Sequence, residues 1–243
     1  MSGLFNGTVA SITLRATMGR RRALIFALPS VILILVTLAL KAAGSASPNW
    51  PSVILGTFGF TVVLPLTALI IGTSVLGAEI DDGSIIHLLA TPVRRSSVIV
   101  TKFVVAAGLT MLLVAVPMLV AGLIATGGAT KLAIGLFVGA LAGSVIYNAL
   151  FVMISAVTTR AIAVGLLYVL FWEGLLGNLV SGARELSIGH YSLGIANSIA
   201  HDATLHAGLS LTTAVVMGAI VTVATLTVAA RRLAHFSLRG DAL

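Results

Sequence analysis

The stretch Gly77–Lys102, GAEIDDGSIIHLLATPVRRSSVIVTK, separates two long runs that contain no charged residue, 53–78 and 103–125. Each of these runs is long enough to cross a bilayer as a helix. Within the stretch, three acidic residues come first, an apolar patch follows, and a proline and three basic residues close it. Four large aliphatic side chains within five residues are unusual in a loop that faces only water. The stretch therefore predicts a loop between two membrane spans that another surface covers.

The order of residues in this stretch gives the loop a local shape. Gly83 breaks the helix that continues from the first run, and Ser84 can cap a short helix whose residues 85, 88 and 89 share one face. Pro92 ends that helix, because a proline disfavours helical geometry in the residue before it. The prediction is a short amphipathic helix between two breaks. A helix that lies on the lipid surface is the competing interpretation.

This pattern resembles the first cytoplasmic loop of type-2 ABC transporter permeases, which are six-span subunits that pair with separate ATPase subunits. In that family the loop has an acidic run, a glycine, a small hydroxyl residue, apolar residues, a proline, an arginine and a lysine that opens the third span. It carries a coupling helix that docks in a groove of the ATPase. The resemblance implies that the following residues form the ATPase interface: Glu79, Asp81, Asp82, Gly83, Ile85, Leu88, Leu89, Arg94 and Arg95.

The composition is that of an integral membrane protein. Hydrophobic residues make up 58% of the 243 residues and charged residues 9%, whereas about a quarter of a soluble domain is charged. The net charge of +7 is concentrated at the ends of apolar runs, which indicates membrane topology rather than a nucleic-acid surface. The chain has no cysteine, which excludes disulfides and thiolate metal sites.

The predicted fold is an all-α membrane protein with six transmembrane helices, an N-terminal amphipathic elbow helix and a short cytoplasmic coupling helix. It forms a single transmembrane permease domain, 1–243. A frayed basic tail is the alternative for the elbow, and a signal peptide is the alternative for the first span, although its apolar run is too long for one. The predicted segments are an elbow at 1–22, spans at about 23–41, 53–78, 103–125, 132–157, 161–180 and 209–230, a coupling loop at 79–102 and an outer loop at 181–208.

The distribution of basic residues predicts the orientation of these spans. With the N-terminus inside, the inner segments contain eleven Lys and Arg residues and the outer segments three. Cytoplasmic loops carry an excess of Lys and Arg, so both termini are expected in the cytoplasm of a bacterial plasma membrane. The coupling loop 79–102 then lies on the side where ATP is.

Three features inside the predicted spans have a physical meaning of their own. Pro65 and Pro117 predict kinks in the second and third spans. The fourth span has Gly135, Gly139 and Gly143 at every fourth position, which lets another helix approach closely, and packing within the bundle is favoured over a dimer seam.

Glu173 is the only acid inside an apolar run, in the outer third of the span 161–180. A carboxylate in the membrane is costly, so it should face protein or water. It either belongs to a substrate path or gate, or pairs structurally near the outer surface, for example with Arg184.

No catalytic, metal or nucleotide site is expected in this chain. The phosphate-binding pattern G-x-x-x-x-G-K-[ST] is absent, so ATP and Mg would be bound by a partner. An intramembrane serine protease would need a histidine base, and none lies in the six spans. His201 and His206 are five residues apart, which is not one helical face, and a solvated loop is the favoured interpretation.

The predicted function is the permease subunit of an ABC exporter for an apolar or amphiphilic compound such as a drug, lipid or peptide. Its expected partners are two ATPase subunits, a second permease, identical or related, and membrane lipid, but no nucleic acid. The alternatives are a subunit of an ATP-driven ion exporter and a secondary transporter or channel without an ATPase. Spans one to four and six have no ionisable group near mid-membrane, which argues against ion-coupled transport. A structural membrane anchor is the third possibility.

Overall fold

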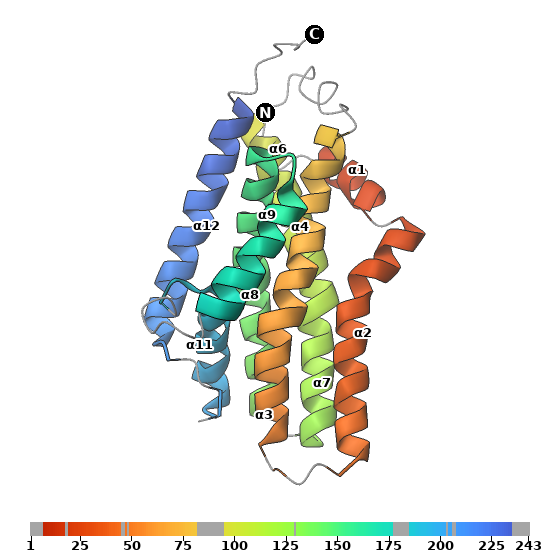
Figure 1. The fold of residues 1–243 in the computed structure, drawn as a ribbon, viewed down its shortest axis with the longest axis vertical. Coiled ribbons are helices and arrows are strands. Elements are labelled where there is room, and N and C mark those ends of the chain that lie inside the picture. Colours follow the sequence, from red (N-terminus) through yellow and green to blue (C-terminus); the bar gives the residue numbers. More distant parts are fainter. Residues whose placement is uncertain are drawn as a thin grey trace.

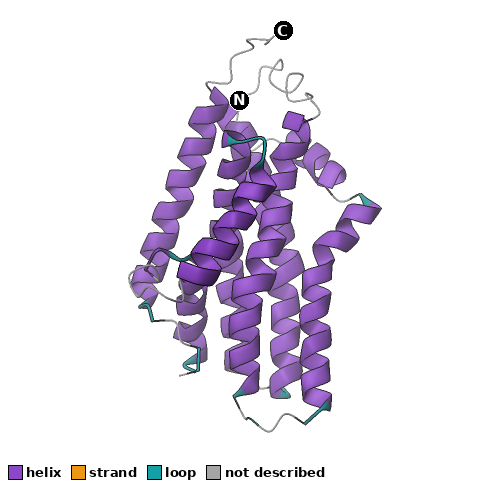
Figure 2. Ribbon diagram, in the orientation of Figure 1, coloured by secondary structure: helices purple, strands orange, loops and turns teal. Residues whose placement is uncertain are grey.

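The computed structural model of this chain describes residues 7–17, 19–44, 47, 49–81, 95–128, 130–176, 185–202, 204–205 and 208–234. Within these residues there is no strand, and long helices run side by side along one axis (Figure 1 and Figure 2). The helices are α1 (Gly7–Thr17), α2 (Arg20–Ala42), α3 (Trp50–Ile54), η1 (Leu55–Val63), α4 (Leu64–Asp81), α6 (Arg95–Thr110), η2 (Met111–Ala115), α7 (Val116–Thr126), α8 (Thr130–Val157), α9 (Ala161–Leu167), η3 (Tyr168–Leu176), α11 (Ile188–Ala200) and α12 (Leu211–Ala234).

Five helices of the described chain are long and apolar enough to cross a membrane, which makes this a multi-pass, all-α membrane protein. They overlap the predicted spans one to four and six. A sixth apolar helix, Ala161–Leu175, is shorter, and its length of about 22 Å is less than the roughly 30 Å of a hydrocarbon core. The five long helices are Ala23–Ala42, Trp50–Gly77, Ser96–Thr126, Lys131–Val157 and Leu211–Leu233.

Each predicted proline kink coincides with a stretch of π-helix. The elements η1 and η2 have hydrogen bonds from residue i to i−5, and Pro65 and Pro117 follow them within two residues. Proline cannot donate a backbone hydrogen bond, and its ring clashes with the carbonyl four residues earlier, so a wider turn before it relieves the clash. Through η1 the helix α3–η1–α4 is continuous from Trp50 to Asp81.

The helix α8 forms the centre of the bundle, where it contacts α4, α6, α7, α9, α11 and α12. In its most apolar 18 residues 61% are buried, compared with 22% in α2 and 17% in α12. The two peripheral helices expose large aliphatic side chains such as Leu24 and Val223, which suits contact with lipid. Tyr147 and Phe151 of α8 stack with a centroid distance of 5.9 Å in the core.

The glycine stripe of α8 packs against α11, within the chain. A Cβ atom built on Gly139 would lie 2.5 Å from the carbonyl oxygen of Ser192, and one on Gly135 2.5 Å from that of Ala196. Only glycine permits such a close approach, so the stripe accommodates a helix of the same chain, as the sequence favoured. The partner is the short helix α11 of the predicted outer loop 181–208.

Two connections define the ends of the bundle, which we call the α2–α3 end and the α8–α9 end (Figure 1). The α7–α8 turn lies at the α2–α3 end, where Gly127 has a left-handed φ of 68° and ends α7. The α8–α9 turn is short, and the amide of Arg160 donates to Thr158 Oγ1 at 3.2 Å. Arg231 and Arg232, at the end of α12, are exposed near this turn.

The predicted coupling helix lies outside the described residues, which stop at Asp81 and resume at Arg95. Of the proposed interface, Glu79 and Asp81 lie in the last turns of α4, and Arg95 begins α6. The other six residues fall in the gap: Asp82, Gly83, Ile85, Leu88, Leu89 and Arg94.

Lys102, which the sequence placed at the opening of the third span, instead lies two turns inside α6. It is fully buried, and its Nζ donates to the carbonyl oxygen of Val75 at 2.5 Å. Because α6 begins at Arg95, residues 95–102 of the predicted loop belong to the helix.

Helix α1 occupies part of the predicted elbow and packs against α6 and α4. Its buried positions are Val9, Thr13 and Thr17, spaced four residues apart on one face. Ile12 is 51% exposed and so lies beside the buried face.

Candidate functional site

Glu173 is buried in η3, where it is 4% exposed, and it accepts four hydrogen bonds. Its Oε1 accepts from Tyr168 Oη at 3.0 Å and from the amide of Ile188 at 2.9 Å. Its Oε2 accepts from Ser187 Oγ at 2.5 Å and from the amide of Gly189 at 3.2 Å. All four donors are neutral, and together they satisfy both oxygens of an ionised carboxylate.

These contacts place the carboxylate at the N-terminus of α11. The first amides of a helix have no partner within the helix, and the helix dipole makes this end favourable for negative charge. Ser187 is the N-cap, since its Oγ accepts from the amide of His190 at 3.3 Å. Ser187 gives its only hydroxyl hydrogen to Glu173, so His190 Nδ1 is the donor in its 2.9 Å contact with Ser187 Oγ. Glu173 and Ser187 thus cap α11 jointly.

Aromatic side chains surround the carboxylate. Tyr168 packs edge-on against Phe151, with a centroid distance of 6.5 Å, and this holds its hydroxyl toward Glu173. Tyr147 is fully buried, and its hydroxyl has no hydrogen-bond partner within the described residues. A Cβ atom at Gly189 would be 3.1 Å from Glu173 Oε2 and 3.4 Å from Tyr147 Oη, so a glycine lets α11 approach both groups.

The depth of Glu173 differs from the sequence prediction, which placed it in the outer third of a span. Its neighbour Tyr147 lies about 25 Å along α8 from the α2–α3 end and about 15 Å from the other end. Glu173 itself is about 18 Å from the start of α9. The carboxylate is therefore near the middle of the bundle, because η3 stops short and α11 continues toward the α2–α3 end. Arg184, its suggested partner, lies outside the described residues.

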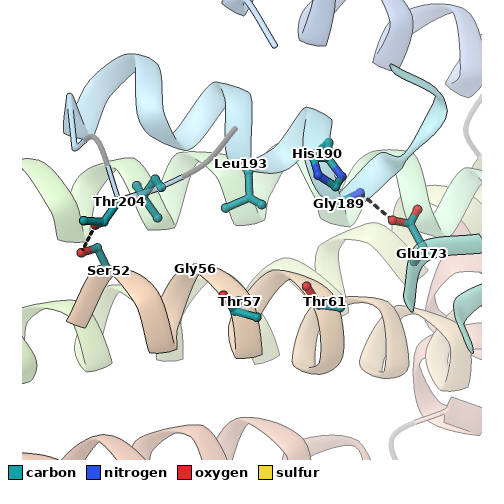
Figure 3. A pocket seen from close by; sticks show the side chains of 10 residues that line it. Ser52, Gly56, Thr57, Thr61, Glu173, Gly189, His190, Leu193 and Thr204 are labelled. Carbon is teal, nitrogen blue, oxygen red and sulfur yellow. Dashed lines mark hydrogen bonds between the residues drawn. The ribbon is translucent and has the colours of Figure 1, made fainter. Parts of the chain in front are cut away.

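A cavity of about 380 Å³ extends from Glu173 along the interface between α11 and the second span (Figure 3). Thr57 and Thr61 of η1 point from the second span toward α11, and Leu193 points from α11 toward them. The lining residues are Ser52, Gly56, Thr57, Thr61, Glu173, Gly189, His190, Leu193, Thr204 and Leu205.

The opposite end of the cavity is closed by the segment that follows α11. Thr204 Oγ1 donates to Asp202 Oδ1 at 2.6 Å and shares a hydrogen bond with Ser52 Oγ at 2.5 Å. Burial favours the neutral form of Asp202, but the hydrogen bonds from Thr204 and Ser52 outweigh it and lower the pKa of Asp202 below its ordinary value. Leu205 packs directly on Gly56. Helix α11 is thus fixed to η3 at one end, and the segment that follows it is fixed to α3 at the other.

The histidines that were considered as metal ligands lie at and beyond the C-terminal end of α11. Within the described residues no group of three His, Asp or Glu side chains could hold a metal ion. His201 ends α11 in a left-handed conformation, and its Nδ1 contacts the carbonyl oxygen of Ile199, while His206 is outside the described residues.

The partners of Glu173 and the threonines of the cavity were not predictable from the sequence. The only local signal was Ser187, a common N-cap residue three positions before His190. Nothing local marks Tyr147 or Tyr168, since both look like ordinary span residues.

The fold defines a multi-pass α-helical membrane protein with a buried carboxylate and a polar cavity between its spans. The chain belongs to the ABC-2 transporter family, because the family described as ABC-2 family transporter protein matches residues 41–215, more than half of the chain. This confirms the resemblance drawn from the stretch 77–102. The matched segment includes every residue that lines the cavity. No curated protein matches the chain.

Proposed function

We propose that this chain is the permease subunit of an ABC exporter, forming the substrate path and coupling to a separate ATPase. The observation that carries the proposal is the cavity between the second span, η3 and α11, in a chain of the ABC-2 family. Membrane ligand sites form where spans are interrupted, since irregular backbone at that depth must line a cavity or be buried in protein. The given sequence has no phosphate-binding loop, and in this proposal ATP is bound and hydrolysed by a partner subunit.

In this proposal the membrane is crossed six times, with both termini in the cytoplasm. The fifth crossing combines α9–η3 with α11, which extends from Glu173 toward the α2–α3 end. The α8–α9 end carries Arg160, Arg231 and Arg232 and faces the cytoplasm, in keeping with the positive-inside rule. Helix α1 serves as the elbow. The loop 82–94 then reaches the ATPase through its short helix.

The exposed face of the fifth span supports pairing with a second permease, identical or related. Four large side chains on α9–η3 are more than half exposed: Ile162, Leu167, Leu170 and Phe171. In a permease that has no partner, lipid would cover this face. Two permeases with two ATPases would place their second and fifth spans around a central path. Closure of the ATPase dimer around ATP would move residues 84–90, tilt the spans and open the path outward.

The cargo class we propose is an apolar or amphiphilic compound. Leu193 and Leu205 provide apolar surface in the cavity, while Thr57 and Thr61 provide hydroxyls for a polar group. Such a mixture fits an amphiphile better than a purely apolar lipid. An exported ion is the second candidate, favoured by the carboxylate of Glu173 at the end of the cavity.

Co-purification with the double variant Leu88→Asp, Leu89→Asp tests the coupling part of the proposal. Each leucine contributes roughly 1.5–3 kcal/mol when fully buried, and a buried carboxylate adds a desolvation cost. We expect a tagged permease to retain its membrane level but to lose most of the ATPase that the unchanged chain brings down.

The control is Thr159→Asp, which adds a charge to the exposed α8–α9 turn at the same end of the bundle. It should leave ATPase recovery unchanged. Full recovery with the double variant would show that this helix lies on lipid and does not couple the permease to an ATPase.

A further inference from the structure

We infer that the cavity between α11 and the second span selects an organic cation with an apolar body. This inference rests on the proposed function and narrows its cargo class. It follows from the charges at the two ends of the cavity and from the residues between them.

The first observation is that Glu173 has no counter-ion within the described residues. Its hydrogen bonds come from a tyrosine, a serine and two backbone amides, none of which carries a full charge. Helix α11 contributes only a partial positive charge through its dipole. Among the described residues, no full positive charge therefore offsets the carboxylate at the inner end of the cavity, in surroundings where water screens little.

A second carboxylate lies at the opposite end. Asp202 accepts from Thr204, which lines the cavity, and hydrogen bonds hold it in its charged form. None of the ten described lining residues is a lysine or an arginine, and His190 is the only basic side chain among them. Figure 3 shows the two ends: Glu173 with Gly189, and Thr204 with Ser52. Two acids at the ends of a cavity whose described lining holds no fixed cation favour a positively charged occupant.

The residues that line the cavity favour an organic cation over a metal ion. Both oxygens of Glu173 are already saturated by donors, so a metal ion would have to displace α11 to be bound directly. An organic cation needs no direct ligand, because it is attracted by charge and gains affinity from contact with Leu193 and Leu205. The volume of about 380 Å³ suits a small organic molecule.

Binding to the purified full-length chain in phosphatidylcholine nanodiscs, without any ATPase, tests the inference. The probes are tetraphenylphosphonium and tetraphenylborate, which have similar size and shape but opposite charge. We expect saturable binding of tetraphenylphosphonium above that of empty nanodiscs, and none of tetraphenylborate. Thr57→Phe fills the cavity and should weaken binding by about tenfold or more. Val223→Phe, on the exposed face of α12, is the matched control and should leave binding unchanged.

Glu173→Gln should also weaken binding of tetraphenylphosphonium. If this variant does not fold, the comparison of the two probes and the effect of Thr57→Phe still test the inference. Binding of tetraphenylborate that is lost with Thr57→Phe would overturn the inference. Cation binding that Thr57→Phe does not reduce would overturn it as well. The co-purification of an ATPase is measured separately. If the ATPase co-purifies but tetraphenylphosphonium does not bind, only the proposed cargo class is rejected. If tetraphenylphosphonium binds but no ATPase co-purifies, the proposed coupling to an ATPase is rejected.

Discussion

Glu173 stabilises the fold through hydrogen bonds from four neutral donors, which together satisfy both oxygens of its carboxylate. Two of its four hydrogen bonds come from backbone amides of α11, so the carboxylate fixes a helix rather than a single side chain. A buried acid usually needs a cation, but a helix N-terminus with a serine cap supplies comparable stabilisation. The α11 N-terminus therefore supports a structural role for Glu173, and the pairing with Arg184 stays a prediction because Arg184 lies outside the described residues.

Glu173→Gln should lower the free energy of unfolding by about 2 kcal/mol, because the amide NH₂ of Gln would face donors instead of accepting from them. The measurement is the thermal midpoint of the purified chain in detergent. Glu185→Gln is the matched control, since Glu185 is exposed shortly before α11 and its side chain makes no hydrogen bond in the described structure. An equal loss of stability with Arg184→Ala would instead indicate an ion pair to that arginine.

Tyr147 and Tyr168 allow a second comparison at this scale, since both lie near Glu173 but only Tyr168 donates to it. Tyr168→Phe should cost about 1 kcal/mol through the lost hydrogen bond. Tyr147→Phe should be neutral or stabilising, because it removes a buried hydroxyl that has no partner in the described structure. The two thermal midpoints, measured side by side, check this difference. A larger loss with Tyr147→Phe would mean that its hydroxyl is hydrogen-bonded.

Among the elements, the long spans were predictable and the interrupted one was not. The predicted spans 23–41 and 132–157 correspond to α2 (Arg20–Ala42) and α8 (Thr130–Val157), because burial in lipid demands a long, nearly continuous apolar sequence. Hydrophobicity does not reveal where a span stops short, since Tyr168–Leu176 is as apolar as a complete crossing. Helix α11 looks like a polar loop because its Ser and Gly residues face the glycine stripe and the cavity instead of lipid. The partners of Glu173 come together only through this packing.

Gly139→Ala should destabilise the contact between α8 and α11. The new Cβ atom would lie 2.5 Å from the Ser192 carbonyl oxygen and 2.8 Å from Ala196 Cβ, so backbone would have to move. We expect a loss of about 2 kcal/mol, in the range of overpacked cores, measured as thermal stability. Gly108→Ala in α6 is the control, because a Cβ there meets no atom within 4 Å and alanine favours helix. A change in oligomeric state with no loss of monomer stability would restore the dimer-seam interpretation.

At the scale of the whole molecule, the cavity beside η3 and the basic residues of the α8–α9 end lie in different parts of the bundle. The cavity extends from mid-bundle toward the α2–α3 end, while α4 ends at Asp81 and α6 begins at Arg95 at the opposite end. The continuous helix Trp50–Asp81 connects the two ends, so in the proposed mechanism a displacement at one end would be transmitted as a tilt of this helix. This mechanism requires the α8–α9 end to face the cytoplasm, and hydrophobicity alone does not set that orientation. It depends on the few basic residues that flank the spans.

Single cysteines can test this orientation directly, because the chain has none of its own. Ser47→Cys and Lys131→Cys lie at the α2–α3 end, and Thr159→Cys and Arg232→Cys lie at the α8–α9 end; all four positions are exposed. In intact cells an impermeant thiol reagent should label the first pair and spare the second. After permeabilisation all four should react, which controls for burial of the thiol. Labelling at Thr159 in intact cells would place the α8–α9 end outside, and the loop 82–94 would then be unable to meet an ATPase that uses cytoplasmic ATP.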